Sequence, residues 1–269
     1  MDLKATTAAT YGATADHFDD APLSFWERFG SATVERLGLR PGERVLDACC
    51  GTGASALPAA QRVGEQGLVI GVDLSEGALA LARAKAARLG LANVEFRAGD
   101  VEATGLAPAS FDAVVCVFGI FFLPDMSAGV RELWRLLRPG GRLALTVWGP
   151  DIFEPATTAF WDAVGSERPD LVGGFHPWNR ITTPEALSAL LADSDVPGAD
   201  IVPEAGRHPV GAVEDWWTIV LGTGYRATVE QLGTQAAERV RAANIAALRR
   251  NDVRSIATNV IYATATKPR

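Results

Sequence analysis

The stretch at residues 47–53, DACCGTG, comes directly after a short apolar run, RVL, at residues 44–46. A short apolar run followed by glycines is typical of a strand that is buried on both faces of a sheet. Gly51 and Gly53 then allow a turn in which the backbone approaches a ligand closely, because neither residue carries a Cβ atom. The stretch therefore predicts a strand that ends in a ligand-binding turn and leads into a helix.

Four further segments have the same short, mostly apolar character. They are LVIGVD at 68–73, VEFRAGD at 94–100, FDAVVCVFG at 111–119 and GRLALTVW at 141–148. Helix-like stretches lie between strands, and the clearest spans residues 75–89, with Ser75 as the N-cap and Gly90 as the stop. This alternation predicts parallel strands joined by right-handed crossovers in a doubly wound, Rossmann-like α/β sheet.

The segments around this core predict a lid and a cap on one domain. Residues 1–40 are helix-like with an aromatic stripe, and we expect them to form a helical lid before the core at 41–148. Beyond the core we expect cap insertions at 149–199 and 210–254, with helices at 154–164, 184–192, 213–221 and 228–250. The remaining segments, 200–209 and 255–267, predict two strands that pair antiparallel at the sheet edge and bring the sheet to seven strands.

The composition argues against several classes of protein. The net charge is −7 and no Lys/Arg block appears, so a nucleic-acid partner is disfavoured. The beginning of the chain has no apolar leader, and the longest apolar run, 113–123, is about half of a membrane span. We expect a cytoplasmic protein without a membrane anchor. Cys49, Cys50 and Cys116 lack C-x-x-C spacing, so neither a disulfide framework nor a metal site is predicted.

The glycine turn alone leaves its ligand open. Gly51, Gly53 and Ala56 fit G-x-G-x-x-A, the spacing of dinucleotide-binding turns, and Asp73 follows at a suitable distance for a ribose. A tight turn that needs small residues only for packing fits the same pattern. The sequence has no Tyr-x-x-x-Lys pair, which weighs against an NAD(P)-dependent oxidoreductase; this remains an alternative.

Acidic residues end the next two predicted strands. Asp73 closes the second strand, where its carboxylate would accept both hydrogens of a ribose diol. Asp100 closes the third strand, where it would accept from an adenine amino group while the Val101 N–H donates to a ring nitrogen. The fourth strand runs into Val117 and Phe118, which would line the same crevice with apolar surface.

Taken in order, these motifs resemble the class I S-adenosylmethionine-dependent methyltransferases. They are similar above all to the small-molecule branch that includes the ubiquinone and menaquinone biosynthesis methyltransferases. The motifs are DACCGTG, GVDLS, AGD, CVFG and RPGG. The resemblance covers residues 10–148 and weakens after Trp148. It implies S-adenosylmethionine as the cofactor, S-adenosylhomocysteine as its product and a small-molecule acceptor.

The resemblance also implies roles for individual residues. Gly51 and Gly53 would flank the methionine part of the cofactor, and Asp47 would help hold its amino group. Tyr11 lies near the place of a lid tyrosine that touches the cofactor. Cys49 stands where the family often has glycine, and we interpret it as small apolar filling. The full set of implied cofactor-binding residues is Tyr11, Asp47, Gly51, Gly53, Asp73, Leu74, Gly99, Asp100, Val101, Val117 and Phe118.

The acceptor site is predicted less sharply. A sulfonium methyl group is transferred by in-line displacement, which needs alignment and exclusion of water and no covalent intermediate. His17 and His176 are candidate bases, although an exposed histidine among acids, such as His17, is also commonplace. A cofactor-binding protein that does not methylate is a further alternative.

Aromatic residues are unusually dense after the fourth strand, and they suggest a pocket for a flat or apolar acceptor. They are Phe121, Phe122, Trp148, Phe153, Trp161, Phe175, Trp178, Trp216, Trp217 and Tyr225. Of these, Phe122, Trp148 and Trp178 are the residues that we assign to the acceptor pocket.

Overall fold

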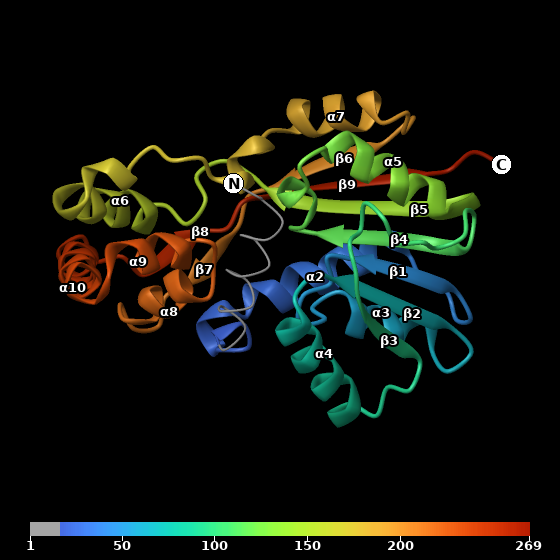
Figure 1. Cartoon of the computed structure of the whole chain (residues 1–269), viewed down its shortest axis with the longest axis horizontal. Helices are drawn as coiled ribbons and strands as arrows, with labels where there is room; N and C mark the ends of the chain where they lie inside the picture. The colour runs from blue at the N-terminus through green and yellow to red at the C-terminus, as the bar shows by residue number, and fades with distance from the viewer. Residues whose placement is uncertain (1–16) are drawn as a thin grey trace.

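The computed structural model describes residues 17–269, and its main feature is a seven-stranded sheet in the order β3-β2-β1-β4-β5-β9-β6 (Figure 1). The strands of this sheet are β1 (Arg44–Ala48), β2 (Leu68–Asp73), β3 (Val94–Ala98), β4 (Phe111–Val117), β5 (Leu137–Trp148), β6 (Asp200–Glu204) and β9 (Val260–Thr266). Strands β1 to β5 are mutually parallel, and β9 pairs antiparallel with both β5 and β6. The predicted doubly wound sheet with an antiparallel C-terminal pair is confirmed.

Helices cover both faces of the sheet. On one face lie α2 (Phe25–Leu37), α3 (Ala56–Val63) and α4 (Glu76–Arg88), and on the other lie α5 (Met126–Leu136) and α7 (Pro184–Asp193) (Figure 1). Alternate residues of a strand therefore enter different layers: Val45 packs in the cluster with α3, whereas Leu46 packs in the cluster with α5. Because both layers are apolar, the inner strands β1, β2 and β4 are nearly continuous hydrophobic runs, whereas the edge strand β3 is largely exposed.

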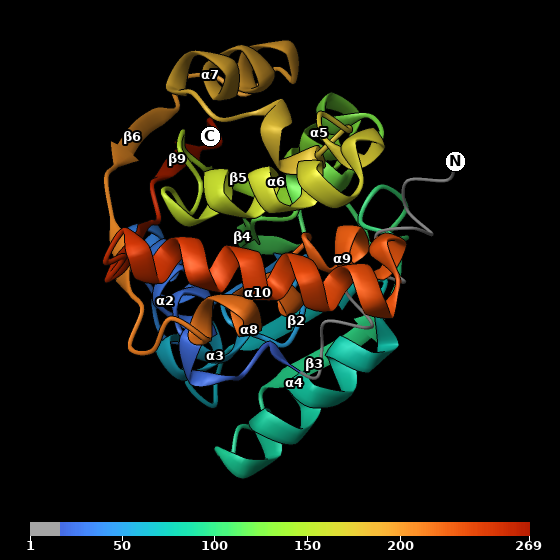
Figure 2. The ribbon, with the colours of Figure 1, turned by 90° about the vertical axis from the view of Figure 1, so that its left-hand side faces the viewer.

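The cap is helical and lies beyond the carboxyl ends of the parallel strands. It contains α6 (Ala156–Glu167), α8 (Asp215–Leu221), α9 (Arg226–Leu232) and α10 (Thr234–Arg250). Figure 2 shows α10 crossing the face of the cap with α6 and α8 on either side of it. The single helix predicted at 228–250 is wrong, because Gly233 adopts a φ of 73° and separates α9 from α10.

Each of the two predicted final strands is broken. Strands β7 (Arg207–Pro209) and β8 (Ser255–Ala257) form a separate two-stranded sheet, whereas β6 and β9 stay in the large one. The two breaks face each other: the Gly206 N–H donates to Asn259 Oδ1 at 3.1 Å, and the Thr258 N–H donates to the Gly206 carbonyl at 2.8 Å. The two paired segments therefore leave the large sheet at the same level, and their continuations, β7 and β8, pair with each other beside the cap.

Local signals that the sequence contains explain the helix starts. Ser75 caps α4 by accepting from the Ala78 N–H at 3.2 Å, as predicted. Asp125 caps α5 in the same way, accepting from the Ala128 N–H at 2.9 Å.

The connection from β3 to β4, residues 99–110, contains no helix, so this crossover is a loop that begins at the carboxyl edge of the sheet. No helix within residues 17–269 is long and apolar enough to cross a membrane.

Gly30 lets α2 pack directly against the glycine turn. A Cβ atom at this position would lie 2.2 Å from the Ala54 carbonyl oxygen. We expect Gly30→Ala to lower the free energy of unfolding by about 1 to 3 kcal/mol, because the backbone clash outweighs alanine's better helix propensity. Urea unfolding measures the change, and Ser31→Ala on the same helix is the control with an expected change of about 0.5 kcal/mol or less. Equal stability of the Gly30→Ala and native proteins would contradict the close packing.

Candidate cofactor and acceptor site

One pocket lies at the carboxyl ends of the parallel strands, where neighbouring crossovers turn to opposite faces of the sheet. Eleven of the predicted site residues line it: Gly51, Asp73, Leu74, Gly99, Asp100, Val101, Val117, Phe118, Phe122, Trp148 and Trp178. The pocket runs from the glycine turn to the cap, so cofactor and acceptor residues border the same space. The predicted Tyr11 lies outside the described residues.

The glycine turn presents its backbone to the pocket. Gly51 has a φ of 52° and open space where a Cβ would stand, as expected for a close ligand approach. Gly53 has a φ of 90° but does not line the pocket; its Cβ position would lie 3.2 Å from the Leu57 side chain. Gly53 therefore shapes the turn from the α3 side, and the structure does not place it against the pocket.

Asp73 clamps the turn to the start of α4. Its Oδ2 accepts from the Gly51 N–H and its Oδ1 accepts from the Ser75 N–H, both at 2.9 Å. Burial raises the pKa of Asp73, and these two backbone hydrogen bonds oppose that rise. A carboxylate has about four lone-pair sites. Asp73 can therefore accept ribose hydroxyls in the pocket while it holds the turn.

Asp47 lies behind the turn rather than in the pocket lining. It is fully buried, and Ser55, which does line the pocket, donates to its Oδ2 at 2.7 Å. Among residues 17–269, Oδ1 is buried without a hydrogen-bond partner. Burial raises the pKa of Asp47 to about 7, despite the opposing Ser55 hydrogen bond. An orphaned carboxylate oxygen beside the turn fits the amino group of an amino-acid ligand, which is the role implied for Asp47.

The loop after β3 supplies the third acidic group. Asp100 lines the pocket, and its Oδ1 accepts from the Glu102 N–H at 3.0 Å. Gly99 and Val101 line the pocket on either side of it, and the Val101 side chain is buried. A carboxylate between apolar surfaces at this edge fits the polar rim of an adenine ring.

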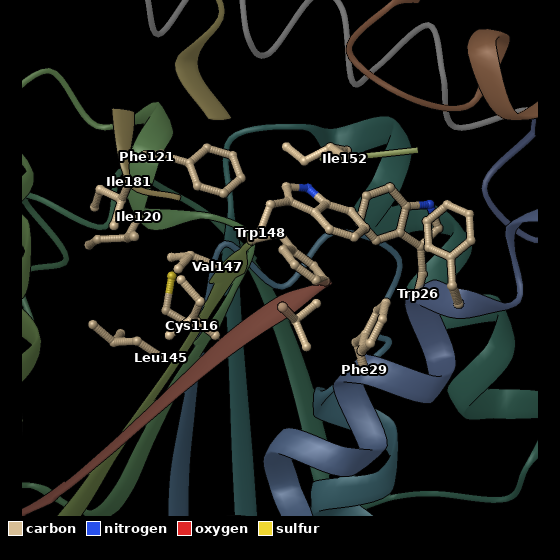
Figure 3. Packing of buried hydrophobic residues seen from close by; sticks show 14 of the residues in the cluster. Trp26, Phe29, Cys116, Ile120, Phe121, Leu145, Val147, Trp148, Ile152 and Ile181 are labelled. Carbon is tan, nitrogen blue, oxygen red and sulfur yellow. The ribbon is translucent and has the colours of Figure 1, made fainter. Parts of the chain in front are cut away.

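Aromatic rings wall the pocket between α2 and β5. Phe118 stacks on Trp148 with ring centroids 4.2 Å apart, and Trp26 meets both rings edge-on. Figure 3 shows Trp26 and Phe29, from α2, directed toward Trp148 at the end of β5. Sequence reasoning assigned Trp26 only to the apolar stripe of a helix. Its place in the pocket depends on how α2 packs, which the stripe does not reveal.

A second glycine turn, GTGY at residues 222–225, closes the cap side of the pocket. A Cβ at Gly224 would lie 2.2 Å from the Trp178 ring, so this indole packs directly against the backbone. Tyr225 lines the pocket, and burial raises its pKa to about 12, so the phenol stays protonated at neutral pH. Thr223 and Gly224 were missed as site residues, although G-x-G recurs there as at Gly51.

Neither candidate base lines the pocket. His17 Nδ1 lies 2.9 Å from Asp20 Oδ2, and its half-buried side chain starts beside Gly222 of the cap. His176 stacks on Trp178, with ring centroids 4.9 Å apart, and burial lowers its pKa. Within residues 17–269, no histidine borders the pocket itself, and His176 lies behind the Trp178 ring that does.

Cys49 lines the pocket and packs against the end of β4. A Cβ at Gly119 would lie 2.8 Å from Cys49 Sγ and 2.9 Å from Cys116 Sγ, so both thiols crowd this glycine. The hydrogen bond with Cys116, together with burial, raises the pKa of Cys49 well above its usual value. The thiol is therefore protonated and a poor nucleophile, in line with its interpretation as apolar filling.

Comparisons with known proteins agree with this geometry. Residues 45–141 match the family model described as a methyltransferase domain. This match assigns residues 45–141 to a methyltransferase domain. The chain is 34% identical to a nocamycin O-methyltransferase from Saccharothrix syringae over 196 residues. This aligned segment covers 72% of this chain and 63% of the relative. The chain is 31% identical to a ubiquinone/menaquinone biosynthesis C-methyltransferase from Cronobacter sakazakii, over 58% of this chain and 61% of the relative.

Solved structures place the methyltransferase domain in the same fold. A SAM-dependent methyltransferase from Aquifex aeolicus superposes with a TM-score of 0.55 at 23% identity, over 71% of this chain and 91% of that chain. The chain spans less than two thirds of the length of the curated relatives named above. The resemblance to ubiquinone and menaquinone biosynthesis methyltransferases, drawn from the sequence motifs, is confirmed for this part of the chain.

Proposed function

We propose that this protein transfers the methyl group of S-adenosylmethionine to a small, apolar or aromatic metabolite. The observation that carries the proposal is the continuity of the pocket. One end has the glycine turn, Asp73 and Asp100, and the other end has Trp178 and Tyr225. A cofactor bound at the first end would therefore present its reactive group to an acceptor held at the second.

The residues divide into two groups by the work they would do. When bound, S-adenosylmethionine supplies a methyl group that is electrophilic because it is attached to a sulfonium. Asp73 would accept the ribose hydroxyls, Asp100 and the Val101 N–H would bind the adenine, and Asp47 would compensate the charge of the amino group. These contacts orient the cofactor and lower the entropic cost of reaction.

The aromatic wall would align the acceptor and exclude water. Phe118 and Trp148 form a stacked pair, and Trp26 covers its edge, so aromatic surface lines the middle of the pocket and would exclude water once an acceptor is bound. Tyr225 would donate a hydrogen bond to an acceptor oxygen, since its raised pKa keeps the proton in place.

A titration with S-adenosylhomocysteine and, separately, with NADH tests the cofactor. We expect calorimetry to show that S-adenosylhomocysteine binds and that NADH does not, because the acidic groups at the strand ends repel the negatively charged diphosphate of NADH, which S-adenosylhomocysteine lacks. Binding of NADH alone would replace the proposal with the oxidoreductase alternative.

Turnover separates methyl transfer from cofactor binding without transfer. The two relatives named above are an O- and a C-methyltransferase. The acceptor panel therefore needs both phenolic hydroxyls and carbon acids on flat apolar compounds. We expect S-adenosylhomocysteine to form only when a suitable acceptor is present. Cofactor binding with no product across a broad panel would favour a binding protein that does not methylate.

A further inference from the structure

Lys85 is a buried lysine that joins three segments at the edge of the pocket. Its side chain on α4 is 7% exposed. Its Nζ donates to Asp19 Oδ1 at 2.6 Å and to Thr52 Oγ1 at 3.0 Å. Asp19 belongs to the lid turn, which we define as residues 17–24, and Thr52 belongs to the glycine turn. One ammonium group thus connects the lid turn, the glycine turn and α4.

The residues next to these partners form walls of the pocket. Phe18 precedes Asp19, lines the pocket and stacks on Trp26 with ring centroids 5.3 Å apart. Thr52 itself lines the pocket between Gly51 and Gly53 and is buried. The position of the Lys85 ammonium therefore fixes Phe18 relative to the glycine turn, across the space where a cofactor would enter.

The energetics suit a contact that opens and closes. A buried ammonium is costly unless it is paired, so Lys85 holds its partners while it stays inside. Asp19 is 42% exposed, so the pair lies at the protein surface, where water can take over both charges when the lid turn moves away. Arg83, two residues earlier on the same helix, is exposed, and its hydrogen bonds within residues 17–269 go to Glu76 and the Phe96 carbonyl.

We propose that Lys85 is a positioning residue that latches the lid turn to the glycine turn and sets the rate at which the cofactor leaves. The proposal rests on the proposed function, because the pocket must hold a cofactor for a release rate to exist. The latch acts through Asp19 and Thr52, and Lys85 itself does not border the pocket.

The dissociation rate of S-adenosylhomocysteine tests the latch. We expect Lys85→Met and Asp19→Asn each to raise this rate by about tenfold, and the double variant to be no faster than either single one, because both changes break one contact. Lys85→Arg keeps the cation and is expected to restore most of the native residence time. Arg88→Met, which removes an exposed cation from the same helix, is the matched control and leaves the rate unchanged.

Two further readouts separate a latch from a structural role and from failure of the proposed function. Methionine fills the buried site without a charge, so Lys85→Met is expected to keep or raise the free energy of unfolding while release becomes faster. Hydrogen exchange of the peptide covering residues 17–24, in protein without ligand, is expected to speed up in Lys85→Met and not in Arg88→Met. This readout holds even if the ligand proves not to be S-adenosylhomocysteine.

Three results would overturn the latch. They are unchanged exchange of residues 17–24 in Lys85→Met, unchanged release in Asp19→Asn, and release rates that multiply in the double variant. A different pair of results would separate the two proposals. If the native protein did not bind S-adenosylhomocysteine but exchange were faster in Lys85→Met, the proposed function would be refuted and the contact between Lys85 and the lid turn would be supported.

Discussion

Asp73→Ala is expected to weaken S-adenosylhomocysteine binding by about a hundredfold or more. The native carboxylate holds the Gly51 and Ser75 N–H groups at 2.9 Å and lines the pocket. Its removal would take away the ribose contact, worth about 1.5 to 3 kcal/mol, and would also release the glycine turn from α4. The sum exceeds about 2.7 kcal/mol, which corresponds to a hundredfold change in affinity at 25 °C. Calorimetry at pH 8 measures the difference.

Asp112→Ala is the matched control for this prediction. Asp112 is also a buried aspartate that accepts a backbone N–H, from Arg44 at 2.7 Å, but it lies at the amino end of β4, away from the pocket. We expect this change to lower stability and to leave the affinity within about twofold of the native value. Asp73→Asn keeps one acceptor oxygen and is expected to fall between Asp73→Ala and the native protein. Equal affinities of Asp73→Ala and the native protein would remove Asp73 from the cofactor site.

The core of the fold was predictable because its signals are local. The inner strands β1, β2 and β4 are short apolar runs, and Ser75 and Asp125 mark helix starts with side chains that cap their own helices. The acids that end β2 and β3 reach the pocket because the carboxyl ends of parallel strands meet at one edge of the sheet. Residues that directly follow these strands in the sequence can therefore be predicted to lie in the site.

The cap was less predictable because its geometry depends on contacts between distant segments. The paired breaks at Gly206 and Asn259 arise from hydrogen bonds across strands, so neither strand alone reveals its interruption. Trp26 reads as a helix-stripe residue and becomes a pocket wall only because Gly30 brings α2 against the glycine turn. His17 and His176 carried the right chemistry for a base, but chemistry alone did not place them in the pocket.

S-adenosylhomocysteine affinity is expected to fall by about tenfold per pH unit below pH 7, or about a hundredfold between pH 7 and pH 5. Burial holds the pKa of Asp47 at about 7, so below this pH the free protein carries a neutral carboxyl group. A cofactor ammonium group held beside the glycine turn favours the charged carboxylate of Asp47, so binding must release a proton. Calorimetry between pH 5.5 and 8.5, repeated at pH 6.5 in two buffers of different ionisation enthalpy, measures the slope and the released proton.

Asp47→Asn tests whether this carboxyl group is the source of the slope. The amide does not titrate, so the variant is expected to bind weakly at pH 8 and with a nearly constant affinity across the range. Asp73→Asn is the control, because it weakens binding and keeps the slope that belongs to Asp47. An unchanged slope in Asp47→Asn would assign the proton to another group.

The same substitution is expected to make the protein without ligand more stable. The pKa of Asp47 is raised on folding, so its favourable contribution is complete below the unfolded value of 3.8 and is lost as the pH rises through about 7. At pH 8 the native protein therefore contains a buried, poorly compensated carboxylate, and Asp47→Asn removes that charge. We expect its free energy of unfolding at pH 8 to rise by about 2 to 4 kcal/mol, and to differ little from the native value at pH 4. Urea unfolding at pH 8 and at pH 4 measures these two free energies.

The combined outcome assigns the role of Asp47. If Asp47→Asn is more stable and binds more weakly, the burial of Asp47 serves the cofactor rather than the fold. If the variant loses stability at pH 8, Asp47 is a structural residue of the turn.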